Sequence, residues 1–114
     1  MKLPEKLITM IEEADFFIHN AEEEVIEFQK YSSAGHDFVF DICTEENLYL
    51  FRENILAYYQ DFDISYETYL WLDSTGHGKN GAPYEMIDVY KDMEECREFI
   101  MELYNIVDNY IIHS

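Results

Sequence analysis

Residues 36–42 alternate between apolar and polar side chains, and this pattern constrains the fold more than any other feature of the sequence. The segment reads His-Asp-Phe-Val-Phe-Asp-Ile, which places Phe38, Phe40 and Ile42 on one face of an extended chain. The backbone groups of such a strand need a partner strand. The nearest β-prone segment is 24–31, and the intervening Ser-Ser-Ala-Gly sequence at 32–35 can form a turn. The sequence therefore predicts an antiparallel hairpin.

Helical spacing dominates the rest of the chain. Apolar residues three and four apart predict helices over 4–18 and 44–60, a short helix capped by Asp63 or Ser65, a short helix at 84–90 and a long helix that begins after Asp92 as its cap. Residues 73–83 are the one evident loop. The helical series could also continue from residue 18 to residue 30, so a single long helix is the alternative to the first strand of the hairpin.

These elements predict a mostly helical α+β fold in which one antiparallel β-hairpin packs on three to four amphipathic helices. The chain is 48% hydrophobic, which suffices for a core, and no linker-like segment divides it. We expect a single domain over residues 1–114.

The charge of the chain indicates the kind of partner it binds. Seven Lys and Arg residues stand against 25 Asp and Glu residues, for a net charge of −18. Duplex DNA carries one charge per roughly 1.7 Å of its axis, so 18 charges correspond to about 31 Å of duplex. A compact domain of this length has a radius of gyration of about 13 Å, so the chain carries across its width a net charge comparable to that of the same length of DNA. Such a protein repels nucleic acid and anionic membranes and attracts basic protein surfaces. We expect a basic protein partner, with no direct binding of nucleic acid and no membrane contact; the oligomeric state stays open.

Two clusters of carboxylates are the candidate partner-binding surface. Residues three and four apart on a helix are neighbours, so a run of acids at that spacing can imitate a row of phosphates. The alternative for each cluster is an ordinary solvated face. The candidates are Glu22, Glu23, Glu24 and Glu27 in the first third of the chain and Asp88, Asp92, Glu94, Glu95, Glu98 and Glu102 in the last helices.

No motif in the chain predicts catalysis, a cofactor or a metal site. Residues 76–81 match the spacing G-x-G-x-x-G, but they follow a predicted helix rather than a strand, which argues against a dinucleotide site. The four histidines are scattered, and Cys43 and Cys96 fit reduced core residues better than a disulfide or a zinc site. We therefore expect a protein that is not an enzyme, with no catalytic residues, no cofactor and no metal ligands.

Several short segments resemble a family of mobile-element proteins. They are the segments 31–38 (Tyr-Ser-Ser-Ala-Gly-His-Asp-Phe), Phe62-Asp63, Gly76-His77-Gly78 and Gly81-Ala82-Pro83. They are similar to short uncharacterised acidic proteins carried on phages and conjugative elements of low-GC Gram-positive bacteria. The resemblance implies a setting in which small acidic proteins disarm host defence nucleases by occupying their nucleic-acid channels.

Together, charge and resemblance predict a non-enzymatic DNA mimic of the anti-restriction or anti-CRISPR type. The alternative is an immunity, antitoxin or adaptor protein that binds a basic partner. Residues 1–5 lack the apolar core of a signal peptide, and no apolar run reaches the roughly 18 residues of a membrane span. We expect the protein in the cytoplasm.

Overall fold

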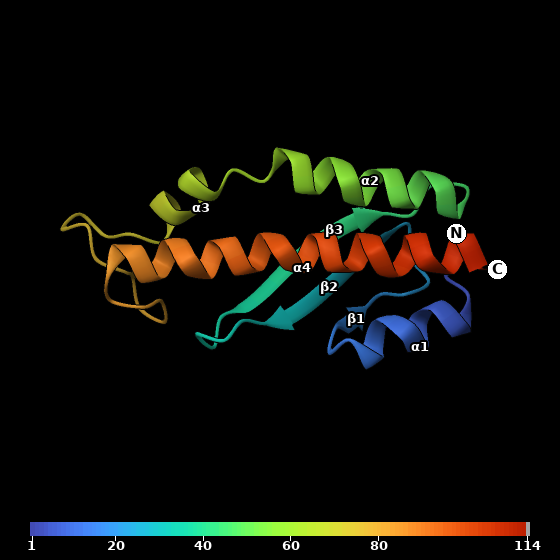
Figure 1. Ribbon diagram of the computed structural model, residues 1–114, viewed down its shortest axis with the longest axis horizontal. Helices are drawn as coiled ribbons and strands as arrows, with labels where there is room; N and C mark the ends of the chain where they lie inside the picture. Colours follow the sequence, from blue (N-terminus) through green and yellow to red (C-terminus); the bar gives the residue numbers. More distant parts are fainter. Residues whose placement is uncertain (114) are drawn as a thin grey trace.

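A computed structural model describes residues 1–113 and shows helices packed on one face of a three-stranded antiparallel sheet (Figure 1). Helix α4 crosses in front of the sheet in this view, with α2 and α1 on either side of it. The elements in chain order are α1 (Glu5–Glu13), β1 (Phe17–His19), β2 (Val25–Tyr31), β3 (Asp37–Cys43), α2 (Leu48–Asp61), α3 (Ile64–Leu70) and α4 (Met86–His113). The predicted α+β class is confirmed, and the sheet has one strand more than the predicted hairpin.

The hairpin of β2 and β3 follows the predicted alternation. Phe28 lies opposite Phe40 and Ile26 opposite Ile42, and all four side chains are buried. The other face of the sheet carries exposed residues such as Val39. The choice of a strand rather than a continuing helix for residues 25–31 is therefore confirmed.

The first helix is shorter than predicted, because it ends at Glu13 and the chain then enters a strand. Asp15 adopts a φ of 70°, which breaks the helix. Residues 17–19 then pair with 27–29 on the free edge of β2, so their backbone groups bond to the sheet. Ile18, predicted to lie on a helix face, instead sits opposite Phe28 in the sheet.

The two middle helices begin with side-chain caps. The Asn47 side chain accepts a hydrogen bond from the Leu50 amide at 2.9 Å, and that of Asp63 from the Tyr66 amide at 3.2 Å. Of the two caps predicted for the short helix, Asp63 is correct. Helix α2 begins later than predicted, so Glu45 and Glu46 precede it rather than forming its first turn.

Helix α4 is a single element where the sequence predicted two. Its 28 residues extend about 42 Å, close to the 49 Å long axis of the molecule. Asp92 is not a helix cap, because it lies within α4 and its side chain is buried. The apolar face of α4 joins α1, α2 and the sheet in one core. In the described part of the chain, none of the helices combines the length and the apolarity that a bilayer crossing requires.

Candidate functional site

The surface of the protein is strongly acidic. Of the 25 Asp and Glu residues 19 are exposed, whereas only four of the seven Lys and Arg residues are. The other basic side chains lie against the body of the protein. Lys30 bonds the Ala14 carbonyl and the Glu102 carboxylate, Arg52 pairs with Asp108 at 2.8 Å, and the Arg97 guanidinium stacks 3.8 Å from the Tyr59 ring centroid. Few cations therefore remain on the surface to offset the carboxylates.

Apart from Asp92, the predicted acidic residues of α4 fall into two groups in the structure. Asp88, Glu94 and Glu98 are exposed, and within residues 1–113 their side chains make no hydrogen bond or ion pair. Glu95 accepts hydrogen bonds from the Ser33 amide at 2.9 Å and from the Ser33 hydroxyl at 2.7 Å, while Glu102 pairs with Lys30. The carboxylates available to a partner on this helix are thus fewer than the spacing predicted.

Asp92 is the predicted surface residue that the structure contradicts. Its side chain is 3% exposed and accepts a hydrogen bond from His36, so it cannot belong to an acidic surface. The reason is its position on α4, because Asp92 falls on the stripe that faces the hairpin turn, with the buried residues Met93 and Cys96.

The predicted acidic residues of the first third lie at the β1–β2 connection and on the open face of the sheet. Glu22, Glu23 and Glu24 are exposed in the connection, and Glu22 lies 3.1 Å from Lys2. Glu27 is half-buried in β2, directly opposite Asp41 of β3. Two like charges facing each other across a sheet are destabilising, and a positively charged partner would relieve that repulsion.

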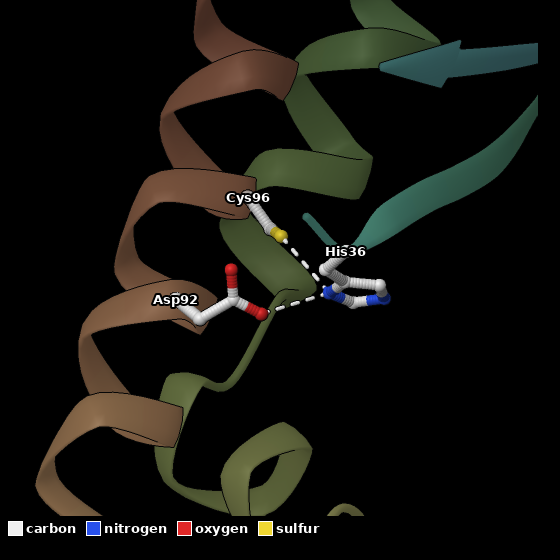
Figure 2. Close-up of side chains that lie close together, drawn as sticks. All are labelled: His36, Asp92 and Cys96. Carbon is white, nitrogen blue, oxygen red and sulfur yellow. Dashed lines mark hydrogen bonds and ion pairs between the residues drawn. The ribbon is translucent and has the colours of Figure 1, made fainter. Parts of the chain in front are cut away.

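A second candidate site lies where the hairpin turn meets α4 (Figure 2). Gly35, with a φ of 85°, lets the chain turn sharply. The buried Ser32 hydroxyl accepts a hydrogen bond from the His36 amide at 3.2 Å, which holds His36 in the turn just before β3. Asp92 and Cys96 are four residues apart on α4 and therefore project from the same face.

The three side chains of this second site converge on one atom. His36 Nδ1 lies 2.9 Å from Asp92 Oδ2 and 3.6 Å from Cys96 Sγ. The imidazole is mostly buried, and the Trp71 ring packs against it at a centroid distance of 5.1 Å. A cavity of about 240 Å³ adjoins the site and is lined by His36, Trp71, Asp92 and the loop residues 80–82.

This His-Asp-Cys cluster lacks the geometry of a nucleophilic triad. Such a triad needs one imidazole nitrogen at the nucleophile and the other at the carboxylate, whereas here the same Nδ1 faces both groups. Burial raises the pKa of the Cys96 thiol well above its usual range, and the nearby Asp92 and Glu95 carboxylates raise it further. A buried, protonated thiol is a poor nucleophile. The donor set instead suits a buried hydrogen-bonded pair or a bound metal ion.

This cluster was not predicted from the sequence, and the prediction that both cysteines lie in the core is wrong for one of them. Both cysteines are free, and Cys96 is buried as predicted, but Cys43 is exposed on β3 rather than in the core. The local signal for the cluster was the spacing of Asp92 and Cys96 on a helix face. His36 lies 56 residues before Asp92, so no local pattern could include it.

The glycine-rich segment has a structural explanation. It connects α3 with α4, so the strand that a dinucleotide site requires before it is missing there. A Cβ added to Gly78 would lie 1.8 Å from the Pro83 carbonyl oxygen, and the Asp73 carboxylate accepts hydrogen bonds from Thr75. The Thr75 hydrogen bonds lower the pKa of Asp73. The segment is therefore a connecting loop held together by contacts among its own residues.

One end of the molecule exposes aromatic and apolar side chains. Helix α3, the following loop and the first turn of α4 lie together at the left of Figure 1. Their exposed side chains include Tyr66, Tyr69, Tyr84, Met86 and Ile87, of which Tyr69 is 70% exposed. Exposed tyrosines of this kind suit a protein interface.

Comparison with known proteins assigns no family. No protein-family model matches the chain, and neither the curated proteins nor the solved structures contain a match. A function must therefore be proposed from the residues themselves.

Proposed function

We propose that the protein is a non-enzymatic DNA mimic that occupies the basic nucleic-acid groove of a host defence protein, as an inhibitor of the anti-restriction or anti-CRISPR type. The observation that carries the proposal is the excess of exposed carboxylates on an elongated body of 49 × 24 × 23 Å. A DNA duplex 49 Å long carries about 29 phosphate charges. The net charge of −18 is more than half of that number.

The exposed acids of α4 are the best candidates for the contact. Glu94 and Glu98 are four residues apart on one helix face, Asp88 precedes them, and no intramolecular partner within residues 1–113 neutralises their side chains. A groove lined with Arg and Lys gains charge-assisted hydrogen bonds from such carboxylates. Complementary charge also accelerates the encounter of the two proteins.

Charge reversal tests this assignment. Replacing Asp88, Glu94 and Glu98 together by Lys should lower the association rate with the target roughly tenfold or more and flatten its dependence on salt. The target would be captured from a lysate of a low-GC Gram-positive bacterium, purified, and measured by surface plasmon resonance. The matched control is the variant in which Glu5, Glu12 and Glu13 of α1, all exposed, become Lys, because it changes the net charge equally on another element.

Three results would change the proposal. If reversal of Glu22, Glu23 and Glu24 abolishes binding and reversal on α4 does not, the mimicry involves the β1–β2 connection instead. Equal losses in the α4 variant and the α1 control would mean that net charge alone drives the encounter. If no reversal affects binding, the acidic surface only keeps the protein soluble.

The exposed tyrosines favour a second candidate, an immunity, antitoxin or adaptor protein that binds a basic partner through aromatic contacts. Tyr side chains beside carboxylates can bind Arg by cation–π contacts as well as by charge. Replacing Tyr66, Tyr69 and Tyr84 by Ala would then abolish binding in a manner largely insensitive to salt. In the mimic, the same triple variant retains most of its affinity.

A further inference from the structure

The cluster of His36, Asp92 and Cys96 has the spacing of metal ligands. One nitrogen, one carboxylate oxygen and one sulfur lie within 4.8 Å of one another. In a tetrahedral zinc site, bonds of about 2.0 Å to nitrogen and oxygen and about 2.3 Å to sulfur place neighbouring ligand atoms roughly 3.3 to 3.6 Å apart. The distances from His36 Nδ1, 2.9 Å to oxygen and 3.6 Å to sulfur, require only small side-chain movements to match these values.

A second, independent observation points to a ligand at the same place. Only two buried side-chain polar atoms among residues 1–113 lack a hydrogen-bond partner, and one of them is Asp92 Oδ1. The Asp92 side chain is 3% exposed, and its carboxylate faces the imidazole and the thiol in Figure 2. A buried carboxylate oxygen without a partner is costly, and a bound cation would remove that cost.

The donor types select the class of ion. Thiolate sulfur and imidazole nitrogen suit zinc and related transition metals, whereas magnesium and calcium prefer sites built from oxygen alone. We propose that His36, Asp92 and Cys96 bind one divalent transition-metal ion of the zinc class, with the fourth position open to water. This inference is independent of the proposed function. The adjoining cavity beside Trp71 gives the ion and its water a path to the cluster.

Binding would join two parts of the fold. His36 belongs to the turn between β2 and β3, and the other two ligands belong to α4, so the ion cross-links the hairpin to the long helix. When the metal binds, the Cys96 thiol loses its proton to solvent. His36 also gives up the Nδ1 proton that it donates to Asp92, so that Nδ1 bonds to the metal and the neutral imidazole carries its proton on Nε2. Because the folded state alone assembles the three ligands, the ion also stabilises that state.

The experiment uses the full chain, first stripped with a chelator and then titrated with Co²⁺ alone and with Zn²⁺ alone. Co²⁺ should produce thiolate-to-cobalt charge-transfer absorption in the near ultraviolet and quench the fluorescence of Trp71, the one tryptophan, whose ring touches His36. Zn²⁺ should displace Co²⁺ and raise the melting temperature by roughly 10 °C at 100 times its Kd. A large excess of Mg²⁺ should leave all three signals unchanged.

Matched cysteine variants identify the sulfur ligand. Cys43→Ala should behave like the parent, because this exposed thiol is outside the cluster, whereas Cys96→Ala should lose the charge-transfer band and the stabilisation by Zn²⁺. If Cys96→Ala does not give a native circular dichroism spectrum, Asp92→Asn and His36→Gln serve instead, each with at least a tenfold loss of Co²⁺ affinity.

Three results would overturn the proposal. One is the absence of a charge-transfer band in the parent protein, which would leave the cluster as a buried hydrogen-bonded pair only. Another is an unchanged band in Cys96→Ala. The third is displacement of Co²⁺ by Mg²⁺, which would assign the binding to the exposed carboxylates.

Discussion

Replacing His36 by Ala, with metal removed by a chelator, should lower the free energy of unfolding by about 3 kcal/mol. The Asp92 carboxylate then stays buried without its hydrogen-bond partner at 2.9 Å, while its other oxygen already lacks one. The cost therefore comes mainly from the desolvated charge and only in part from the lost contact. Urea denaturation at neutral pH, followed by circular dichroism, measures it.

A double-mutant cycle separates these contributions. Asp92→Ala added to His36→Ala removes the orphaned carboxylate, so the double variant should be more stable than His36→Ala alone. His77→Ala is the matched histidine control, because His77 lies in the loop before α4 and stacks on Tyr84 away from the core. A loss below about 1 kcal/mol in His36→Ala would mean that water screens Asp92.

Replacing Phe28 by Ala should cost about 3 to 5 kcal/mol, since the side chain is fully buried at the centre of the sheet. Its ring packs 5.7 Å from that of Phe40 and 6.2 Å from that of Phe51, so truncation leaves a cavity between β3 and α2. Domains of this size are stable by only about 5 to 15 kcal/mol. We expect a variant that is only marginally folded at 37 °C, as measured by thermal and urea denaturation.

Phe17→Ala provides the control for Phe28→Ala. Phe17 belongs to the same sheet, but it is 53% exposed, and its ring packs at a right angle to the Tyr31 ring on the open face, with the ring centroids 6.1 Å apart. Its loss should cost about 1 kcal/mol or less. Equal losses at the two positions would mean that the open face of the sheet is covered by a further surface, such as a second copy of the chain.

The hairpin and the helices on either side of the loop at 73–83 could be predicted from local patterns. Apolar side chains recur every second residue in a half-buried strand and every three or four residues in a helix, so both patterns are visible among neighbours in sequence. Strand β1 could not be predicted in this way. Ile18 continues the helical spacing of α1. The segment is nevertheless a strand, because Asp15 has a left-handed backbone conformation and residues 17–19 pair with the free edge of β2. The prediction that a new helix begins after Asp92 was wrong for a related reason. In the sequence, an Asp that faces the core within a helix cannot be told from an Asp that caps the start of one.

The candidate sites also depend on contacts between residues far apart in the sequence, which local patterns do not reveal. The net charge and the acidic spacing were evident from the sequence, yet Glu94 and Glu95 are adjacent and only the second bonds to the hairpin turn. Which carboxylate is free depends on contacts between residues distant in the chain. The His36 cluster also forms by long-range packing of a turn on α4, so its members looked unrelated in the sequence.

A competition measurement tests the central claim, DNA mimicry, most directly. The captured defence protein is titrated with labelled duplex DNA at several fixed concentrations of this protein, and fluorescence anisotropy gives the apparent Kd for DNA. If the acidic surface occupies the nucleic-acid groove, the apparent Kd rises linearly with the protein concentration, and the variant with Asp88, Glu94 and Glu98 changed to Lys raises it far less. A ternary complex, with the Kd for DNA unchanged at saturating protein, would contradict the mimicry.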